Sequence, residues 1–403
     1  MSFSTRASPG TLALKASYLF FKAIGLIPAR LRHLSPKKGR PTFVYSRGGT
    51  LRNSVLIVSF AVLSCFSVHA MNKADYPNKS PTTEAIEVFK AALGSILVLI
   101  VWTWVCVHQR EAIKVANDFL AIDSVMRSYS NLYSPKTVTQ RFVLVWVFNT
   151  LIWINMFWSD YMVFDHVPVI AFISSVGPNF IFNWFLLMYT FSIIYLRMKV
   201  QAVNDGILRL SADSVSRISA SPGNFDDRFF MKAFFALKGT HMRLHEVISE
   251  MDKFYSFPIL LVIAEMCASI VYTAYYLMVP IFLPSVKQAE IMIFNSVCYL
   301  SMEVFPITIM TISIGQIVQE LGRTADAVHK CLSRVRLSRK AKAELRLFSL
   351  ELLHQNVQFT ACGIFALDGT LLHSICGMTA TYLIILIQFQ PTARPSEENP
   401  NLQ

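Results

Sequence analysis

The sequence predicts an all-α membrane protein with seven transmembrane helices, a cytoplasmic N-terminus and an extracellular C-terminus. Three observations support this fold class. Apolar residues make up 54% of the chain and charged residues only 15%, whereas soluble domains carry about 25% charged residues. Seven apolar stretches are long enough to cross a bilayer as helices. Lysine and arginine gather in alternate connecting segments, as the positive-inside rule requires.

The N-terminal region, residues 1–53, is predicted to be a cytoplasmic segment. Its apolar stretch 12–27 is interrupted by two lysines, a pattern typical of an amphipathic helix in the membrane interface. Phe20 and Phe21 are expected in the lipid headgroup zone. This segment does not have the uninterrupted apolar core of a signal peptide.

Six of the crossings lie within residues 54–314 and the seventh ends the hydrophobic part of the chain. Proline residues at Pro178 and Pro306 are expected inside the fourth and sixth crossings, where each would kink the helix. Residues 315–366 carry apolar residues at helical spacing among many charges, which predicts cytoplasmic helices. Residues 390–403 form an extracellular tail. The predicted crossings are 54–71, 85–107, 142–163, 168–196, 257–280, 290–314 and 367–389.

The orientation follows from the basic residues. Segments 1–53, 109–141, 197–256 and 315–366 hold all but five of the 37 lysines and arginines, and are therefore assigned to the cytoplasm. This topology is the reverse of that of a G-protein-coupled receptor. The net charge of +12 has the same origin and does not indicate nucleic-acid binding, because no soluble basic domain is evident.

The sequence contains no catalytic motif, and we predict that the protein is not an enzyme. There is no Gly-x-Ser-x-Gly sequence, P-loop or pair of cysteines suited to a metal. His241 and His245 are four residues apart, but Met242 stands where a zinc protease needs glutamate, and no third ligand is evident nearby. We interpret them as a solvated helix face, and we expect neither metal nor cofactor.

A small-molecule site is predicted in the outer halves of the third to sixth crossings. Such a site needs a mostly apolar cavity with a few converging polar groups. Spacings of three and four residues place the tyrosines of the fifth crossing on one face and the polar residues of the sixth on another. A membrane-interface belt is the alternative explanation for the aromatic residues. The candidate ligand-binding residues are Trp153, Phe157, Asp160, Asn179, Tyr272, Tyr275, Asn295, Tyr299 and Glu303.

Two glutamates within the predicted crossings are notable because ionisable groups deep in a membrane segment are functional candidates by default. Glu303 is assigned to the ligand site. Glu265 is expected nearer the cytoplasmic half of its crossing, with a structural or gating role. A buried ion pair or a protonated acid that serves structure alone is the alternative for both.

The last crossing carries a stripe of residues at intervals of three to four: Gly377, Thr381, Ile384 or Ile385, and Gln388. Four copies around an axis would line a narrow path in which an apolar ring gates by dewetting and an amide ring coordinates cations. Packing against neighbouring helices through small residues explains the same stripe. From the residues alone, both interpretations remain.

The last crossing ends in Thr381-Tyr382, five aliphatic residues and Gln388-Phe389. This ending resembles the C-terminal signature of insect gustatory receptors of the seven-transmembrane insect chemoreceptor superfamily, and the similarity extends back to about Thr324. The preceding segments 363–368 and 371–375 are similar to the sequence before that signature. Asp368 departs from the family, which commonly has asparagine there.

The resemblance implies a ligand-gated, non-selective cation channel for taste compounds. It implies that 367–389 lines the pore, that Tyr382 couples ligand binding to gating, and that 315–366 forms a cytoplasmic anchor. The protein would be a homotetramer, or a heteromer with other gustatory receptors, in the plasma membrane of a sensory dendrite. Bitter plant metabolites are favoured over sugars, because many sugar-sensing members have an acidic residue where Leu383 stands here. Fructose-sensing members do not share that marker, so fructose remains an alternative.

Two other classes of protein are alternatives. An odorant-receptor-like subunit would share the fold but would need a co-receptor for current. A secondary transporter would show internal repeats or broken helices at corresponding positions, and the sequence shows no repeat.

Overall fold

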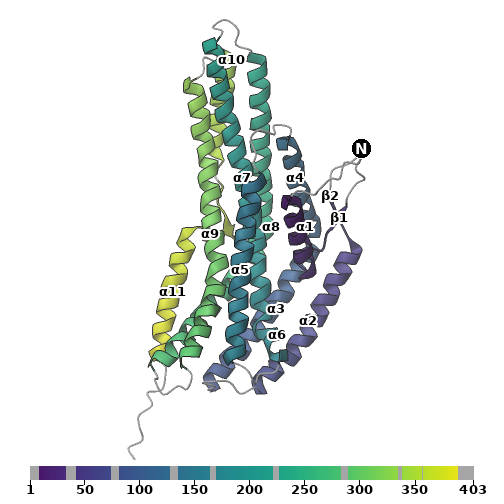
Figure 1. Ribbon diagram of the computed structural model, residues 1–403, viewed down its shortest axis with the longest axis vertical. Coiled ribbons are helices and arrows are strands. Elements are labelled where there is room, and N and C mark those ends of the chain that lie inside the picture. Colours follow the sequence, from purple (N-terminus) through teal and green to yellow (C-terminus); the bar gives the residue numbers. More distant parts are fainter. Residues whose placement is uncertain are drawn as a thin grey trace, which may run out of the picture.

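The computed structural model is an elongated helical bundle (Figure 1). It describes residues 9–32, 42–73, 81–127, 135–163, 169–220, 227–282, 289–334, 338–355 and 357–388. Within these residues, seven helices are long and apolar enough to cross a membrane, which confirms the predicted fold class. They are α2 (Arg47–Lys73), α3 (Pro81–Val107), α5 (Pro135–Val163), α7 (Gly177–Ala220), α8 (Asp227–Phe282), α9 (Ala289–Arg334) and α11 (Gly369–Gln388).

The remaining elements are short. They are α1 (Pro9–Ala23), β1 (Arg30–Arg32), β2 (Thr42–Val44), α4 (Gln109–Arg127), the 3₁₀ helix η2 (Val169–Ala171), α6 (Phe172–Ser175), α10 (Arg339–His354), β3 (Thr360–Ala361) and β4 (Phe365–Ala366). Strands β1 and β2 pair antiparallel, and so do β3 and β4.

The fourth crossing begins differently from the prediction. The chain first forms η2 and α6, and the long helix α7 starts only at Gly177. Pro178 therefore lies in the first turn of α7, where its missing N–H costs no intrahelical hydrogen bond. The predicted kink at Pro178 is wrong for this reason. Pro306 does lie inside α9, and Pro258 and Pro280 lie inside α8.

Helix α7 forms the centre of the bundle. In its most apolar window 78% of the residues are buried, compared with 11% in α2 and in α11. Association of helices in lipid depends on close packing and on interhelical hydrogen bonds, because lipid is as apolar as the side chains. The amide of Asn183 donates to the carbonyl of Met302 at 3.1 Å, and Asn204 donates to the carbonyl of Glu320 at 2.9 Å. These bonds hold α7 against α9 at two levels.

Helix α1 packs against the bundle instead of lying free in the membrane interface. The Phe20 ring meets the Trp184 ring of α7 edge-on, with centroids 4.5 Å apart, and Phe21 is only 4% exposed. The expectation that these two rings sit among lipid headgroups is therefore wrong, because indole rings of α5 and α7 offer them a closely packed site. The hydroxyl of Tyr18 donates to the carbonyl of Ala29, which closes the turn after α1.

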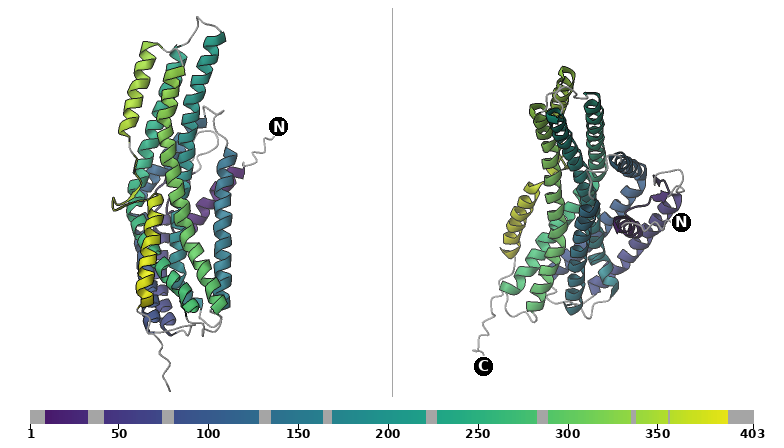
Figure 2. Two further views of the ribbon diagram at one scale, coloured as in Figure 1. Left: turned by 90° about the vertical axis from the view of Figure 1, so that its left-hand side faces the viewer. Right: turned by 45° about the horizontal axis from the view of Figure 1, so that its top comes forward.

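One end of the bundle is an extension made of α7, α8, α9 and α10. In Figures 1 and 2, α10 lies at this end, opposite the C-terminal end of α11. Ser338 caps α10 by accepting a hydrogen bond from the backbone N–H of Ala341 at 3.2 Å. Phe348 of α10 is fully buried and contacts Phe234 of α8. The long charged segments 197–256 and 315–366 of the sequence thus include helical continuations of the crossings.

His241 of α8 lies in this extension, before the predicted crossing 257–280, and is only 2% exposed. Its ring meets the Phe348 ring edge-on, with centroids 5.7 Å apart. The prediction that His241 stands on a solvated helix face is wrong, because α10 covers it. Burial, with a smaller contribution from His245, lowers the pKa of His241 to about 4. Among the described residues, no group of three or more candidate ligands could hold a metal.

This burial makes the stability of the extension dependent on pH. Unfolded histidine has a pKa near 6.5, so below that pH the unfolded chain binds a proton that native His241 does not. Stability is therefore fully present above about pH 6.5 and falls as the pH drops toward 4, by about 2 kcal/mol at pH 5. His241→Phe should remove this part of the pH dependence in thermal unfolding of the purified chain.

The exposed His354 at the end of α10 provides the control. His354→Phe should leave the difference in unfolding midpoint between pH 7 and pH 5 as it is in the unmodified chain. An unchanged difference in His241→Phe would show that His241 is not buried in its neutral form.

A short hairpin joins α10 to α11. Cys362 and Gly363 form its turn with positive φ angles of 51° and 71°, a conformation that glycine adopts without strain. The hydroxyl of Ser256 on α8 donates to the carbonyl of Thr360 at 3.0 Å and accepts from the N–H of Cys362 at 2.6 Å. The hairpin thus fixes the start of α11 to the middle of α8.

Candidate ligand pocket

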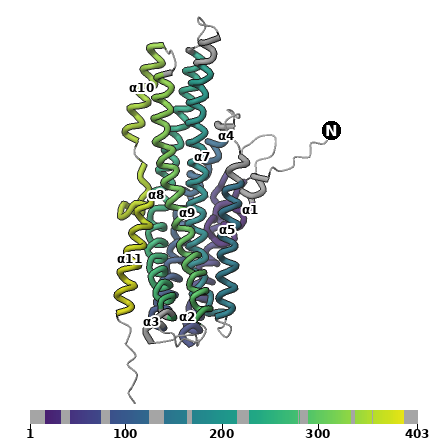
Figure 3. The backbone as a smooth tube through the Cα atoms, turned by 60° about the vertical axis from the view of Figure 1, so that its left-hand side comes forward, coloured from purple at the N-terminus to yellow at the C-terminus, as the bar shows by residue number. Residues whose placement is uncertain are grey.

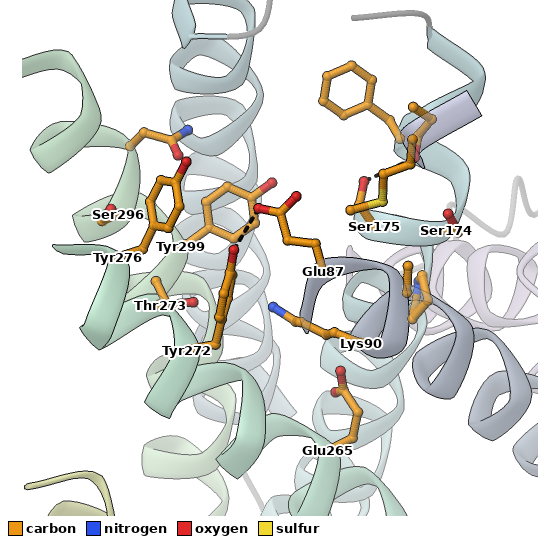
Figure 4. Close-up of a pocket in the computed structure, with 16 residues that line it drawn as sticks. Glu87, Lys90, Ser174, Ser175, Glu265, Tyr272, Thr273, Tyr276, Ser296 and Tyr299 are labelled. Atoms are coloured by element: carbon orange, nitrogen blue, oxygen red, sulfur yellow. Dashed lines mark hydrogen bonds between the residues drawn. The ribbon is translucent and has the colours of Figure 1, made fainter. Parts of the chain in front are cut away.

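A cavity of about 130 Å³ lies in the half of the bundle away from α10. It is enclosed by the last turn of α2, the first turns of α3, η2 and α6, the start of α7, the later part of α8 and the first turns of α9. Figure 4 shows its side chains. The lining residues are Met71, Glu87, Lys90, Ala91, Ala171, Phe172, Ser174, Ser175, Pro178, Glu265, Tyr272, Thr273, Tyr276, Asn295, Ser296 and Tyr299.

Three of the predicted ligand-binding residues line this cavity: Tyr272, Asn295 and Tyr299. Tyr272 donates its hydroxyl hydrogen to Glu87 at 2.6 Å, across the cavity from α8 to α3 (Figure 4). The rings of Tyr272 and Tyr276, one helical turn apart, have centroids 5.9 Å apart. The tyrosines of the fifth crossing were expected on one helix face, and two of them, Tyr272 and Tyr276, lie in the cavity wall.

Asp160 and Glu303 support the cavity from behind. Asp160 of α5 is 3% exposed and accepts hydrogen bonds from the amide of Asn295 at 2.8 Å and from the hydroxyl of Tyr299 at 2.9 Å. Glu303 of α9 is fully buried and accepts from the hydroxyls of Ser269 and Thr273, both on α8. These carboxylates hold the lining side chains in place and do not line the cavity themselves.

The other four predicted residues lie elsewhere. Trp153 is buried in a separate apolar cluster with Met156, Val176, Cys298 and Met302, whereas Phe157 is 52% exposed on the outside of α5. Asn179 is buried and donates to the carbonyl of Ser175 at 3.4 Å, within its own turn. Tyr275 is half-buried and outside the lining set. Among the described residues, none from the third crossing therefore lines this cavity.

The reason is the arrangement of helices around α7 and α9. Helix α5 packs against α9, and its Ser159 and Asp160 are hydrogen-bonded to Asn295 of α9. Helix α3 and the short α6 instead close the cavity on the opposite side. Two serines fix α6 there, because Ser67 of α2 is hydrogen-bonded to Ser174 at 2.7 Å and donates to the carbonyl of Ala171 at 3.0 Å.

Glu87 and Lys90 of α3 are not among the predicted site residues, and Glu265 was expected to have a structural or gating role. All three line the cavity. The available signal was the presence of ionisable residues within or at the start of a membrane helix. Glu87 and Lys90, three residues apart, share a face of α3. Lys90 lies with its ammonium nitrogen 4.0 Å from a carboxylate oxygen of Glu303.

Helix α11 lies along α8 and α9 on the outside of the bundle (Figure 3). Leu371 and Ile375 are buried on its inner face. The predicted pore stripe is exposed in the single chain at Gly377, Thr381, Ile384 and Gln388. Tyr382 is 52% exposed in the single chain.

The fold and the cavity together define a seven-helix membrane protein with an enclosed, partly charged pocket between its helices. Comparison with known proteins then identifies the family. A family model described as 7tm chemosensory receptor matches residues 14–392, and the chain belongs to this family. The resemblance to insect gustatory receptors is confirmed. Because the relatives are chemosensory receptors, the prediction that the protein is not an enzyme is also confirmed.

The similar curated proteins come from Drosophila melanogaster. Putative gustatory receptor 28b is 31% identical over 156 residues, which are 37% of this chain and 33% of that protein. Putative gustatory receptor 28a is 30% identical over 40% of this chain and 36% of that protein. The gustatory receptor for bitter taste 66a is 39% identical over 20% of this chain and 15% of that protein. The chain thus spans about a third of the length of the first two relatives.

Solved structures share the fold over nearly the whole chain. The insect olfactory receptor OR5 from Machilis hrabei superposes with a TM-score of 0.61 at 13% identity, covering 94% of this chain and 98% of that one. The same receptor in complex with eugenol superposes with a TM-score of 0.55 at 14% identity and the same coverage.

Proposed function

We propose that this protein is a ligand-gated, non-selective cation channel for taste compounds, with bitter plant metabolites ahead of sugars such as fructose. The observation that carries the proposal is the cavity with a mixed polar and apolar lining whose walls include α8 and α9, the helices that also contact α11. The similarity to relatives that include a gustatory receptor for bitter taste supports the choice of ligand.

In the proposed assembly the uncovered stripe of α11 lines a pore shared by four subunits, either identical or of different gustatory receptors. Residues 1–53 and the extension at 315–366 lie in the cytoplasm and 390–403 outside. The protein acts in the plasma membrane of a sensory neuron dendrite. The Lys/Arg distribution supports this orientation.

Gating follows from differential affinity. A ligand that binds the open form more tightly than the closed form shifts the equilibrium toward the open form. A ligand in the cavity displaces α8 against α9, and both helices contact α11. The hairpin that Ser256 ties to α8 holds the start of α11, so that movement of α8 reaches the pore helix. Tyr382, exposed on α11, couples this movement to the neighbouring subunit.

The first test is whole-cell current from cells that express this chain alone and are challenged with bitter compounds and sugars. Gln388→Ala should retain the ligand-evoked current but shift its reversal potential under mixed-cation conditions, because an amide ring at the pore contacts the permeating ions. Gln358→Ala, an exposed glutamine before β3, is the matched control and should leave the reversal potential unchanged. Equal reversal potentials in both variants would contradict a pore lined by α11.

A second candidate function, an olfactory-type subunit, is favoured by the structural similarity to the Machilis olfactory receptor. Current that appears only when a co-receptor is expressed with the chain would support this candidate.

A further inference from the structure

The charges around the cavity do not balance. Among the described residues, three acidic side chains, Glu87, Glu265 and Glu303, surround one basic side chain, Lys90. Asp160 adds a further carboxyl group behind the wall formed by Asn295 and Tyr299. A carboxylate removed from water is costly unless a cation or hydrogen-bond donors compensate it. Among the described residues that surround the pocket, carboxyl groups therefore outnumber basic side chains.

Two buried carboxyl oxygens around the cavity lack a hydrogen-bond partner among the described residues. Glu265 lines the cavity and is only 4% exposed, yet its Oε2 has no hydrogen-bond partner in the part of the chain that the structure describes. Oε2 of Glu303 is likewise buried without a partner. Lys90 does not satisfy them, because its ammonium nitrogen is 4.0 Å from Oε1 of Glu303 and lies over the Tyr272 ring, 5.3 Å from its centroid.

The aromatic side chains in the cavity wall are also suited to binding a cation. Tyr272, Tyr276 and Tyr299 lie near one another on the side of the cavity formed by α8 and α9 (Figure 4). Aromatic faces attract cations, most strongly where water is excluded. In the same view the carboxyl group of Glu265 points toward Lys90 and the space between these rings and α3. An ammonium group placed there could contact both a carboxylate and an aromatic face.

We infer that the cavity binds a small protonated organic amine with an aromatic or apolar body, whose ammonium group pairs with Glu265. The inference rests on the proposed function in taking this cavity as the ligand site. The apolar body of the ligand lies against Met71, Phe172 and Pro178 on the other side of the cavity.

The inference is tested with four probes that share a phenylethyl body but differ in the charge or size of the head group: phenethylamine, its N,N,N-trimethyl derivative, 2-phenylethanol and 3-phenylpropanoate. Two measurements are made, the shift in thermal unfolding midpoint of the purified full chain in lipid nanodiscs and the whole-cell current. The two cations should stabilise the chain at lower concentration than the alcohol, and the carboxylate should not stabilise it.

Variants separate the charge from the shape of the pocket. Glu265→Gln should weaken binding of both cations at least about tenfold, as for loss of a desolvated ion pair, and leave 2-phenylethanol binding unchanged. Glu303→Gln should act in the same direction, and it replaces Glu265→Gln if that variant does not fold. Lys90→Met should strengthen cation binding, because it removes the competing cation. Glu290→Gln, exposed on the same helix α9, should change nothing.

The inference is overturned if 3-phenylpropanoate binds best and Lys90→Met abolishes its binding, which would make Lys90 the anchor of an anionic ligand. It is also overturned if neither cation stabilises the chain at concentrations up to about 10 mM. Cation binding without any current would leave the inference standing and contradict the proposed channel. If only the alcohol evokes a current and Glu265→Gln leaves that current unchanged, the inference is overturned and the proposed channel stands.

Discussion

Replacing Gly49 with alanine is expected to destabilise the chain by about 3 kcal/mol or more, because the new methyl group has no space. An ideal Cβ at Gly49 would lie 1.9 Å from the carbonyl oxygen of Pro28, a backbone atom. The two segments cannot easily separate. The amide of Asn53 donates to the carbonyl of Gly25 at 2.6 Å, which fixes α2 against the turn that follows α1.

The measurement is the thermal unfolding midpoint of the detergent-solubilised chain, together with its amount at the cell surface. The neighbouring Gly48 provides a matched control in the same helical turn, where an added Cβ meets nothing within 4 Å. Gly48→Ala should be neutral or slightly stabilising, since alanine favours helix over glycine. Equal midpoints for the two variants would show that α2 does not contact the Pro28 carbonyl as described.

Asp160→Ala is expected to have a second large effect, a loss of about 3 kcal/mol in stability together with loss of the ligand response. The substitution leaves two buried donors, the amide of Asn295 and the hydroxyl of Tyr299, without their shared acceptor. Both donors line the cavity. Their side chains would turn toward other acceptors, so the wall of the pocket formed by α9 would lose its shape.

Asp160→Asn tests whether the hydrogen bonds or the charge matter. The two bonds end on different carboxylate oxygens of Asp160. In Asp160→Asn the carbonyl oxygen can still accept from Asn295 while the NH2 group donates to the Tyr299 hydroxyl, so this variant should lose less stability than Asp160→Ala. Tyr299→Phe, which removes one donor with its acceptor intact, should fall between the two. Unfolding midpoints and ligand concentration–response curves are measured for all three variants. Equal losses in Asp160→Asn and Asp160→Ala would show that the two hydrogen bonds contribute little.

Much of the fold could be predicted from the sequence because its main signal is local. A helix crosses a membrane when enough consecutive residues are apolar, and each of the seven predicted segments overlaps one membrane-length helix. The spacing of Tyr272 on α8, and of Asn295 and Tyr299 on α9, likewise fixed which residues share a helix face. For the site, this local rule identified three lining residues and two supporting carboxyl groups.

The remaining features depend on which helices meet. Periodicity states which face of a helix is buried but not which neighbour covers it, and the choice of neighbour depends on the fit of side chains across the interface. For that reason the sequence assigned α5 to the cavity, whereas α3 with Glu87 and Lys90 closes it. For the same reason His241 was placed in solvent, although α10 buries it.

By itself, the sequence determined the helical class, the seven membrane-length segments and the C-terminal resemblance that placed the protein among chemosensory receptors, because each depends on residues close together along the chain. Only the tertiary structure decided the position of the cavity, the excess of carboxyl groups around Lys90 and the approach of Gly49 to Pro28. These features arise between residues that are distant in the chain, and their energies are set by packing and desolvation, which a local pattern does not specify.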